Sequence, residues 1–318
     1  MADQSIILPP DSAVPASLPP SPPKYTIFRG PNGVRAAWRA LIFLAIVGAF
    51  FFLMGSILRL LGHGNAPTGV SMLRPSGLTI LEGTIFLFTS IAALIMARIE
   101  HRHYGDYGLP IRSAFRKNFW VGASAGFLAI SASLFGIFLS HGFRLTGLAI
   151  HSSHTLIAAT LAWTAAFIVV GLGEEFAFRG YLQFTLTTGM GFWPSALLLS
   201  ALFGLAHAGN PGESRFGLLS VVFFGLLFCL FLRRTGNLWW AVGFHAGWDW
   251  GQTFVYGVAD SGIPAYHNLL NSEFAGRSWI TGGSVGPEAS AFTPIVLAIV
   301  AILFSRAYRE NRPNTPLR

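Results

Sequence analysis

Long apolar runs recur along almost the whole chain, and they limit its fold more than any other feature. A helix needs roughly 20 apolar residues to cross a bilayer, and runs of about this length follow one another from residue 36 almost to the end. Hydrophobic residues make up 53% of the chain and charged residues 11%, a balance that excludes an ordinary soluble enzyme. The sequence therefore predicts an all-α fold, a polytopic transmembrane helical bundle in a cell membrane.

About eight spans are predicted, at residues 37–61, 78–97, 118–140, 155–178 or longer, 193–208, 216–232, 237–256 and 292–308. If the N-terminus is cytoplasmic, 16 of the 21 Lys and Arg residues fall on the cytoplasmic side; the others are Arg59, Arg74, Arg144, Arg215 and Arg277. Positive charge favours the cytoplasmic side of a membrane, so both termini are predicted to be cytoplasmic. Because the basic residues lie at helix ends near the lipid surface, the net charge of +8 requires no nucleic-acid partner.

Three regions are predicted. Residues 1–35 are rich in Pro and Ser and are expected to form a disordered cytoplasmic tail, since they cannot bury enough apolar surface to order themselves. Residues 36–310 are the predicted transmembrane domain, and 311–318 a second cytoplasmic tail.

The connections are expected to be simple. His101 and His103 are expected to be solvated loop residues, and 257–291 is expected to be a plain surface loop, with a lid as the alternative. Cys229 is the single cysteine and lies in an apolar run, so a packing role is expected and no disulfide framework exists.

Three charged residues interrupt the fourth apolar run and point to function. Glu174, Glu175 and Arg179 lie where ionised side chains are costly, so they are expected to face protein or a wet cavity. Glu175 and Arg179 are four residues apart on one helical face and are predicted to form an ion pair. Glu174 then points about 100° away and is left for chemistry. To bury Glu174 deeply enough, the helix is predicted to continue past Arg179, with a kink, to about Thr188.

Two later spans supply histidines. One contains Phe203-Gly-Leu-Ala-His207, and the other contains His245-Ala-Gly-Trp-Asp249, in which His245 and Asp249 share a helical face. Small residues around both histidines are expected to let these helices approach closely; they are Gly204, Ala206, Ala208, Gly243, Ala246 and Gly247.

These side chains suit the hydrolysis of a peptide bond. A carboxylate and a neutral imidazole can deprotonate a water that attacks a carbonyl, and polar groups can stabilise the resulting oxyanion. The alternative is metal-assisted hydrolysis, with His207, His245 and Glu174 binding a divalent metal such as zinc, although the chain has no His-Glu-x-x-His sequence. Nucleophilic catalysis is disfavoured because Cys229, the single cysteine, has no polar partner within its apolar run.

Three motifs resemble those of the CPBP family of intramembrane proteases, which includes type II CAAX prenyl endopeptidases and bacterial bacteriocin-processing or immunity proteins. They are Glu174-Glu175-x-x-x-Arg179, Phe203-x-x-x-His207 and His245-x-x-x-Asp249, within a similar segment of roughly 100–255. The resemblance implies a membrane endopeptidase in which Glu174 and His207 activate water while His245 and Asp249 complete the site.

One residue departs from the family pattern. The family often has asparagine at the position of Asp249, and an ionised aspartate cannot donate a hydrogen bond to an oxyanion. Asp249 is therefore expected to be protonated, to orient His245 or to bind a metal.

The predicted function is an intramembrane endopeptidase for a membrane-associated peptide or protein, either CAAX-type or a bacteriocin or leader peptide. Its expected partners are this substrate and the lipid bilayer, with no nucleic acid. Two alternatives are a proton- or ion-coupled transporter and a non-catalytic immunity or scaffold protein. The transporter is disfavoured by the absence of an inverted repeat.

Overall fold

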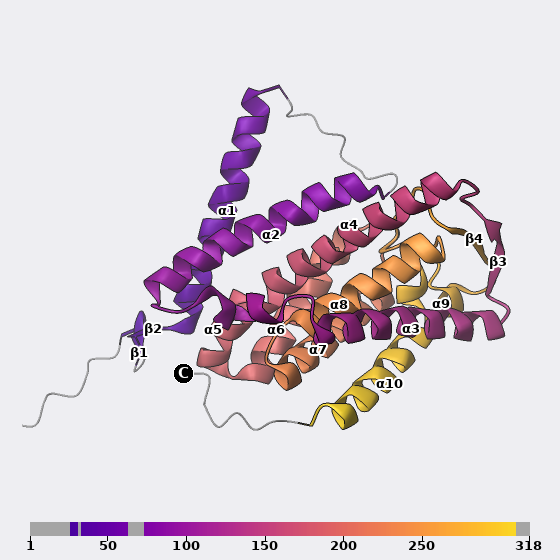
Figure 1. Cartoon of the computed structure of the whole chain (residues 1–318). Helices are drawn as coiled ribbons and strands as arrows, with labels where there is room; N and C mark the ends of the chain where they lie inside the picture. Colours follow the sequence, from indigo (N-terminus) through magenta and orange to yellow (C-terminus); the bar gives the residue numbers. More distant parts are fainter. Residues whose placement is uncertain (1–25, 31–32, 63–72, 310–318) are drawn as a thin grey trace, which may run out of the picture. The chain divides into compact units, whose positions relative to one another are not determined.

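The computed structural model describes residues 26–30, 33–62 and 73–309, and most of these are helical (Figure 1). Most of the predicted tail at 1–35, and all of that at 311–318, lie outside the described residues. Residues up to Arg35 and residues from Ala36 onward form separate units. The described part of the first unit contains an antiparallel pair of short strands, β1 (Arg29–Gly30) and β2 (Gly33–Val34).

Helices occupy all eight predicted ranges, and six of those in the described residues are long and apolar enough to cross a membrane. These candidate spans are α1 (Ala36–Leu60), α2 (Pro75–Ile99), α3 (Lys117–Leu139), the pair α4 (Ser153–Arg179) and α5 (Tyr181–Met190), α6 (Phe192–Ala206) with η3 (His207–Gly209), and α7 (Arg215–Thr235). The shorter helices are α8 (Trp239–Asp249), which continues as a π-helical turn, η4 (Trp250–Val255), and the apolar α10 (Phe292–Ala307).

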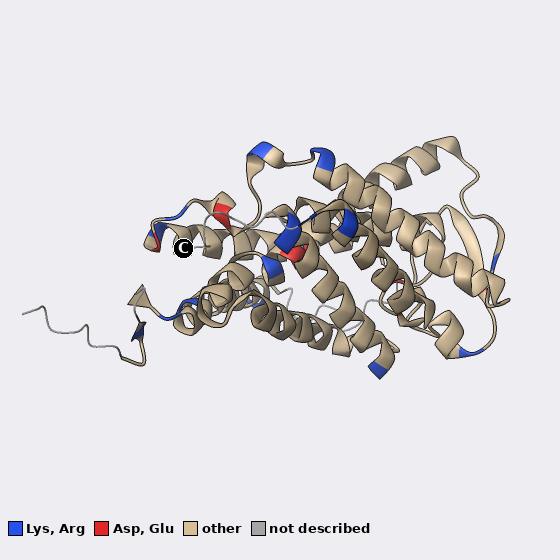
Figure 2. Ribbon diagram, turned by 90° about the horizontal axis from the view of Figure 1, so that it is seen from below, with Lys and Arg blue, Asp and Glu red and all other residues tan. Residues whose placement is uncertain are grey.

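The chain is therefore a multi-pass membrane protein, as predicted. Lys and Arg lie mainly at helix ends and in connections, and long stretches of helix carry no charge (Figure 2). The count of eight spans and the cytoplasmic placement of the termini stay predictions.

The fourth predicted helix is long and interrupted, as the sequence indicated. α4 and α5 together run from Ser153 to Met190, over 38 residues, and Gly180 separates them. A side chain at Gly180 would collide with the carbonyl oxygen of Phe176, so the chain can change direction here only with glycine.

α4 lies between α2 and α8 and approaches both at glycines. A Cβ atom at Gly173 would lie 2.8 Å from the backbone oxygen of Glu82 on α2, and one at Gly171 would lie 2.8 Å from the backbone oxygen of Val242 on α8. Small residues permit such contacts between helices in a membrane. The acidic turn of α4 is thereby held against both neighbours.

The small residues around the histidines pack differently from the prediction. Gly243 and Gly247 on α8 lie against the backbone of Phe119 and Ala123 on α3, and Gly204 on α6 lies against α7. The expectation that these small residues bring α6 and α8 together was wrong, because the three glycines pack against α3 and α7 instead. Glycine spacing marks a face for close packing but does not specify which helix will occupy it.

The connection after η4 folds back over the bundle. Its strand β4 (Leu270–Phe274) pairs antiparallel with β3 (Phe143–Leu148), with a register shift between Leu145 and Gly147, and short helical turns follow at α9 (Ser278–Thr281) and η5 (Pro287–Ala289). The amide of Leu73 donates to the carbonyl of Pro264, and the amide of Tyr266 donates to the carbonyl of Leu73. The start of α2 is thus joined to this connection.

The connection between α2 and α3 contains two 3₁₀ turns, η1 (Tyr104–Tyr107) and η2 (Ile111–Ser113). His101 and His103 are exposed, as predicted for solvated loop residues. Beside them, the Glu100 carboxylate accepts hydrogen bonds from the hydroxyls of Tyr107 and Tyr181 and pairs with Arg39 of α1 at 3.2 Å. This polar cluster joins α1, α2 and α5.

Candidate active site

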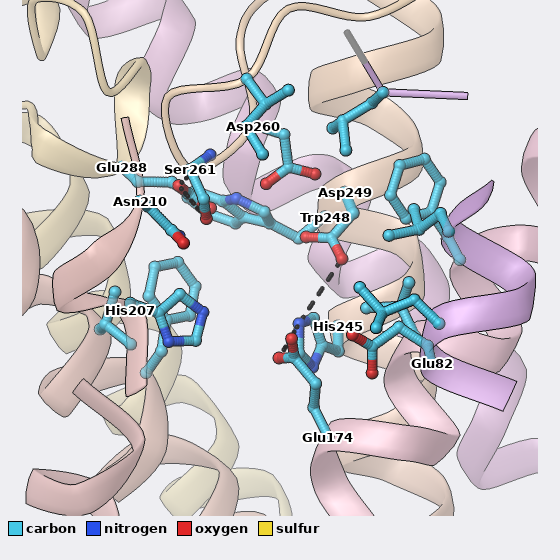
Figure 3. A pocket seen from close by; sticks show the side chains of 18 of the residues that line it. Glu82, Glu174, His207, Asn210, His245, Trp248, Asp249, Asp260, Ser261 and Glu288 are labelled. Atoms are coloured by element: carbon cyan, nitrogen blue, oxygen red, sulfur yellow. Dashed lines mark hydrogen bonds and ion pairs between the residues drawn. The ribbon is translucent and has the colours of Figure 1, made fainter. Parts of the chain in front are cut away.

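Four of the six predicted site residues line one cavity of about 550 Å³. Glu174 comes from α4, His207 from the junction of α6 and η3, and His245 and Asp249 from α8 (Figure 3). The other two, Glu175 and Arg179, are fully buried behind the cavity. Three segments far apart in the sequence therefore meet at one place inside the helical unit.

Glu175 and Arg179 form the predicted ion pair, with 3.3 Å between Arg179 Nη1 and Glu175 Oε1. The guanidinium also lies over the ring of Phe203, 4.2 Å from its centre, a favourable cation–π position. Glu174 is not part of this pair and retains 22% side-chain exposure. The two neighbouring carboxylates are thus divided as the helical spacing predicted.

His245 is surrounded by carboxylates. Its Nδ1 lies 3.1 Å from Glu175 Oε1, while its Nε2 lies 3.5 Å from Glu174 Oε2 and 3.5 Å from Asp249 Oδ2. The imidazole also stacks on the ring of Phe228. Glu175 therefore connects Arg179 to His245 and fixes the orientation of the imidazole from behind.

His207 lies across the cavity from His245 and Glu174 (Figure 3). Its Nδ1 is 2.9 Å from the backbone oxygen of Phe203. Because a carbonyl oxygen can only accept, Nδ1 must carry the hydrogen, and in the neutral ring Nε2 is then an acceptor. This tautomer gives His207 the form of a base.

The cavity also contains acidic residues that the sequence analysis missed. Glu82 comes from α2, and Asp260 and Glu288 come from the connection after η4. A signal existed for Glu82, since it is a lone charge inside an apolar span. Asp260 and Glu288 belong to no motif, so only the fold reveals their place.

The connection 257–291 is not a plain surface loop, and that expectation was wrong. Asp260 accepts a hydrogen bond from the Thr253 hydroxyl at 3.0 Å, and Glu288 accepts from the amide of Ser261 at 3.0 Å. Both carboxylates face the cavity beside Asp249 (Figure 3). Burial raises the pKa of Asp260 to about 6 and that of Glu288 to about 8, because an apolar environment disfavours the charged form.

One group among the described residues has the spacing needed to hold a metal ion. Asp249, Asp260 and Glu288 each offer a carboxylate oxygen, and these oxygens lie within 4.8 Å of one another. An all-oxygen set suits hard cations such as Mg²⁺ or Ca²⁺ better than zinc. The predicted zinc ligands Glu174, His207 and His245 are not brought together in this way, so their arrangement does not fit a zinc site.

Comparison with known families agrees with the motifs. The family model described as type II CAAX prenyl endopeptidase Rce1-like matches residues 155–251, a narrower segment than the predicted 100–255. The match includes all six predicted site residues and confirms the resemblance; it implies a membrane-embedded protease acting on a protein substrate. No curated protein matches the chain. Glu82, Asp260 and Glu288 lie outside the matched segment.

Proposed function

We propose that the chain, whose segment 155–251 belongs to the Rce1-like family, is an intramembrane endopeptidase that cleaves a membrane-anchored peptide or protein. One observation supports this above all: Glu174, His207 and His245, from three different helices, line the same cavity. Buried ionisable residues that meet at a cavity within a membrane protein are characteristic of functional sites.

Water is activated between the two walls of the cavity. His207 Nε2 is free to accept, and the Glu174 carboxylate faces the same space. Together they hold a water and take its proton as its oxygen attacks the scissile carbonyl carbon. The cavity separates His207 from Glu174, which leaves room for water and the peptide.

His245 stabilises the oxyanion that this attack creates. Its Nε2 is 3.5 Å from each of two carboxylates, too far for either hydrogen bond to be strong. Because Nδ1–H donates to Glu175, Nε2 carries a hydrogen only in the imidazolium form of His245, which is paired with these carboxylates, and this second hydrogen can turn to the substrate oxygen. In this proposal Asp249 orients His245 from one side, Glu175 holds Nδ1, and Arg179 holds Glu175.

The test uses purified protein in liposomes with a library of short internally quenched peptides, each carrying a lipid chain. The library has two groups of substrates, prenylated CAAX-type tails and leader-type peptides, which are assayed separately. We expect wild-type protein to cleave peptides of at least one group. Glu174→Gln and His207→Ala should each lower kcat by roughly 10²- to 10⁴-fold, the usual contribution of acid–base groups. Thermal unfolding of each variant shows whether it remains folded.

The proposal fails if folded wild-type protein cleaves nothing in the library, or if both variants cleave as well as wild type. A chelator arm addresses metal dependence. Because the predicted zinc ligands do not converge, we expect cleavage to survive a zinc-selective chelator, and stoichiometric zinc in the active protein would contradict this part of the mechanism.

A further inference from the structure

Glu82 is a buried acid at the cavity for which the proposed mechanism has no role. It lies near the first third of α2, is 6% exposed and lines the cavity. α2 is outside the segment that matches the Rce1-like family. The position of Glu82 therefore comes from the fold of this chain and not from the matched motifs.

The carboxyl group of Glu82 has no structural partner that explains its burial. Its Oε2 is buried and makes no hydrogen bond within the described part of the chain, and no Lys, Arg or His there forms an ion pair with Glu82. Buried polar groups in native proteins nearly always have a partner, and a carboxyl inside a membrane span is costly to keep. A role limited to helix packing does not account for it.

Close packing between α2 and α4 holds the Glu82 carboxyl beside the turn of α4 that carries Glu174. A Cβ atom at Gly173 would lie 2.9 Å from Glu82 Oε2, so the absence of a side chain at the residue before Glu174 makes space for Glu82. Glu82 also interacts electrostatically with Glu174 and His245. Figure 3 shows the Glu82 carboxyl next to His245, on the side of the cavity opposite His207.

We propose that Glu82 is a further catalytic residue, the acid that protonates the leaving amine when the peptide bond breaks. This inference rests on the proposed peptidase function. Water gives one proton to Glu174 as its oxygen bonds to the carbonyl carbon. As the tetrahedral intermediate collapses, the carbon–nitrogen bond breaks and the amine nitrogen takes the proton of the Glu82 acid.

A proton transfer between the two carboxyl groups then returns each to its starting protonation state. After cleavage Glu174 holds a proton and Glu82 has lost one, so transfer from Glu174 to Glu82 returns both to their starting forms. No other reactant is needed, and the net reaction is hydrolysis of one amide by one water. The arrangement divides base and acid between two carboxyls whose helices meet at Gly173.

The experiment compares an amide with an ester at the same scissile position. A lipid-anchored fluorogenic peptide that wild-type protein cleaves is paired with its depsipeptide, in which oxygen replaces the scissile nitrogen. Without a proton from an acid, the ester expels an alkoxide but the amide would have to expel an amide anion, which is a far poorer leaving group, so loss of an acid should affect the amide more. For Glu82→Gln we expect amide kcat to fall about 10²-fold and ester kcat to fall much less.

A pH profile provides a second readout. In wild type, kcat/KM for the amide should fall at high pH as Glu82 loses its proton, and this alkaline limb should be absent in Glu82→Gln. Glu82→Asp, which keeps the acid, should recover part of the amide activity. Thr84→Val is the matched control, because Thr84 is on the same helix and, within the described part of the chain, its hydroxyl donates only to the carbonyl of Ile80 one turn earlier.

The outcomes separate this inference from the proposed function. If wild type cleaves, Glu174→Gln does not, and Glu82→Gln lowers amide and ester equally or keeps the alkaline limb, Glu82 is not the acid. If Glu82→Gln does not fold, Glu82→Met, which also has no acid, decides, since an amide-to-ester ratio unchanged from wild type would overturn the assignment. Failure of wild type to cleave either substrate counts instead against the peptidase function.

Discussion

At the scale of single residues, Arg179 is a charged side chain in a position where burial of the charge is costly. It is fully buried, pairs with Glu175 at 3.3 Å, and leaves its Nε and Nη2 atoms without hydrogen bonds among the described residues. The cost of burying this charge is offset mainly by Glu175 and by the ring of Phe203. The pair is therefore a support for His245 rather than a source of stability in itself.

Arg179→Met is expected to destabilise the protein by about 3–5 kcal/mol, because it leaves the Glu175 charge buried without its partner. The double variant Arg179→Met with Glu175→Gln should recover much of that stability but not activity, since His245 Nδ1 would no longer face a carboxylate. Thermal unfolding in detergent and peptide cleavage measure the two effects. Equal stability of the single and double variants would refute the argument.

The sequence alone predicted much of this residue set. The spacing of Glu175 and Arg179 specified their pairing and left Glu174 for the cavity, because helical geometry is local. It could not reveal Asp260 and Glu288, whose place depends on how a long connection folds back. Glu82 was detectable as a charge in an apolar span, but its neighbour Gly173 is 91 residues away in the sequence, and no local pattern joins the two.

At the scale of helices, the contact between α2 and α4 controls the position of Glu82. Gly173→Ala would place a Cβ 2.8 Å from the backbone oxygen of Glu82, and overpacking of this kind costs typically about 1–3 kcal/mol. We expect lower thermal stability and a loss of amide cleavage from a displaced Glu82.

Gly83→Ala is the control at the same interface. Its Cβ would meet only Val169, at 3.6 Å, an ordinary contact, so stability should be unchanged or raised by about 0.5–1 kcal/mol through helix propensity. If both alanine variants behave alike in unfolding and cleavage, close approach at Gly173 is not what positions Glu82.

The connection after η4 should respond to pH. The pKa values of Asp260 and Glu288 are about 6 and 8, above their ordinary values of 3.8 and 4.5. A group whose pKa is raised by folding stabilises the fold while it is protonated, and this contribution is lost as pH rises through the folded-state value. Stability of this connection is therefore highest near pH 4 and falls between about pH 4 and pH 8.

Hydrogen exchange of residues 257–291 between these pH values, corrected for intrinsic exchange rates, measures the effect. Glu288→Gln should flatten the upper part of the pH dependence. The control is Glu273→Gln, because Glu273 is exposed and pairs with Arg144 at the surface. An unchanged profile in Glu288→Gln would show that the Glu288 carboxyl does not set the pH dependence.

The helices themselves were predicted well because apolar length and helical period are properties of consecutive residues. The continuation of the fourth helix past Arg179 was anticipated from the depth that Glu174 required, whereas the position of its interruption at Gly180 was not predicted. The partners of Gly243 and Gly247 were predicted wrongly, since several helices offer a surface to which a glycine face can fit.

At the scale of the whole molecule, the orientation in the membrane stays a prediction that labelling can check. The sequence places the connection 98–117 in the cytoplasm and 257–291 on the opposite side. Cys229 is fully buried, so wild-type protein should not react with an impermeant maleimide. In oriented vesicles His103→Cys and Glu273→Cys, both at exposed positions, should label from opposite sides. Labelling of both from one side would overturn the predicted topology.

The two hydrogen bonds between Leu73 and residues 264–266 also bear on how this protein can be engineered. They join the start of α2, the helix that carries Glu82, to the connection that carries Asp260. A shortened or swapped connection would therefore change the position of α2 and would also remove or displace Asp260 and Glu288, which the connection contributes to the cavity. Chimaeras with related proteins should exchange these two segments together, because neither is an independent module.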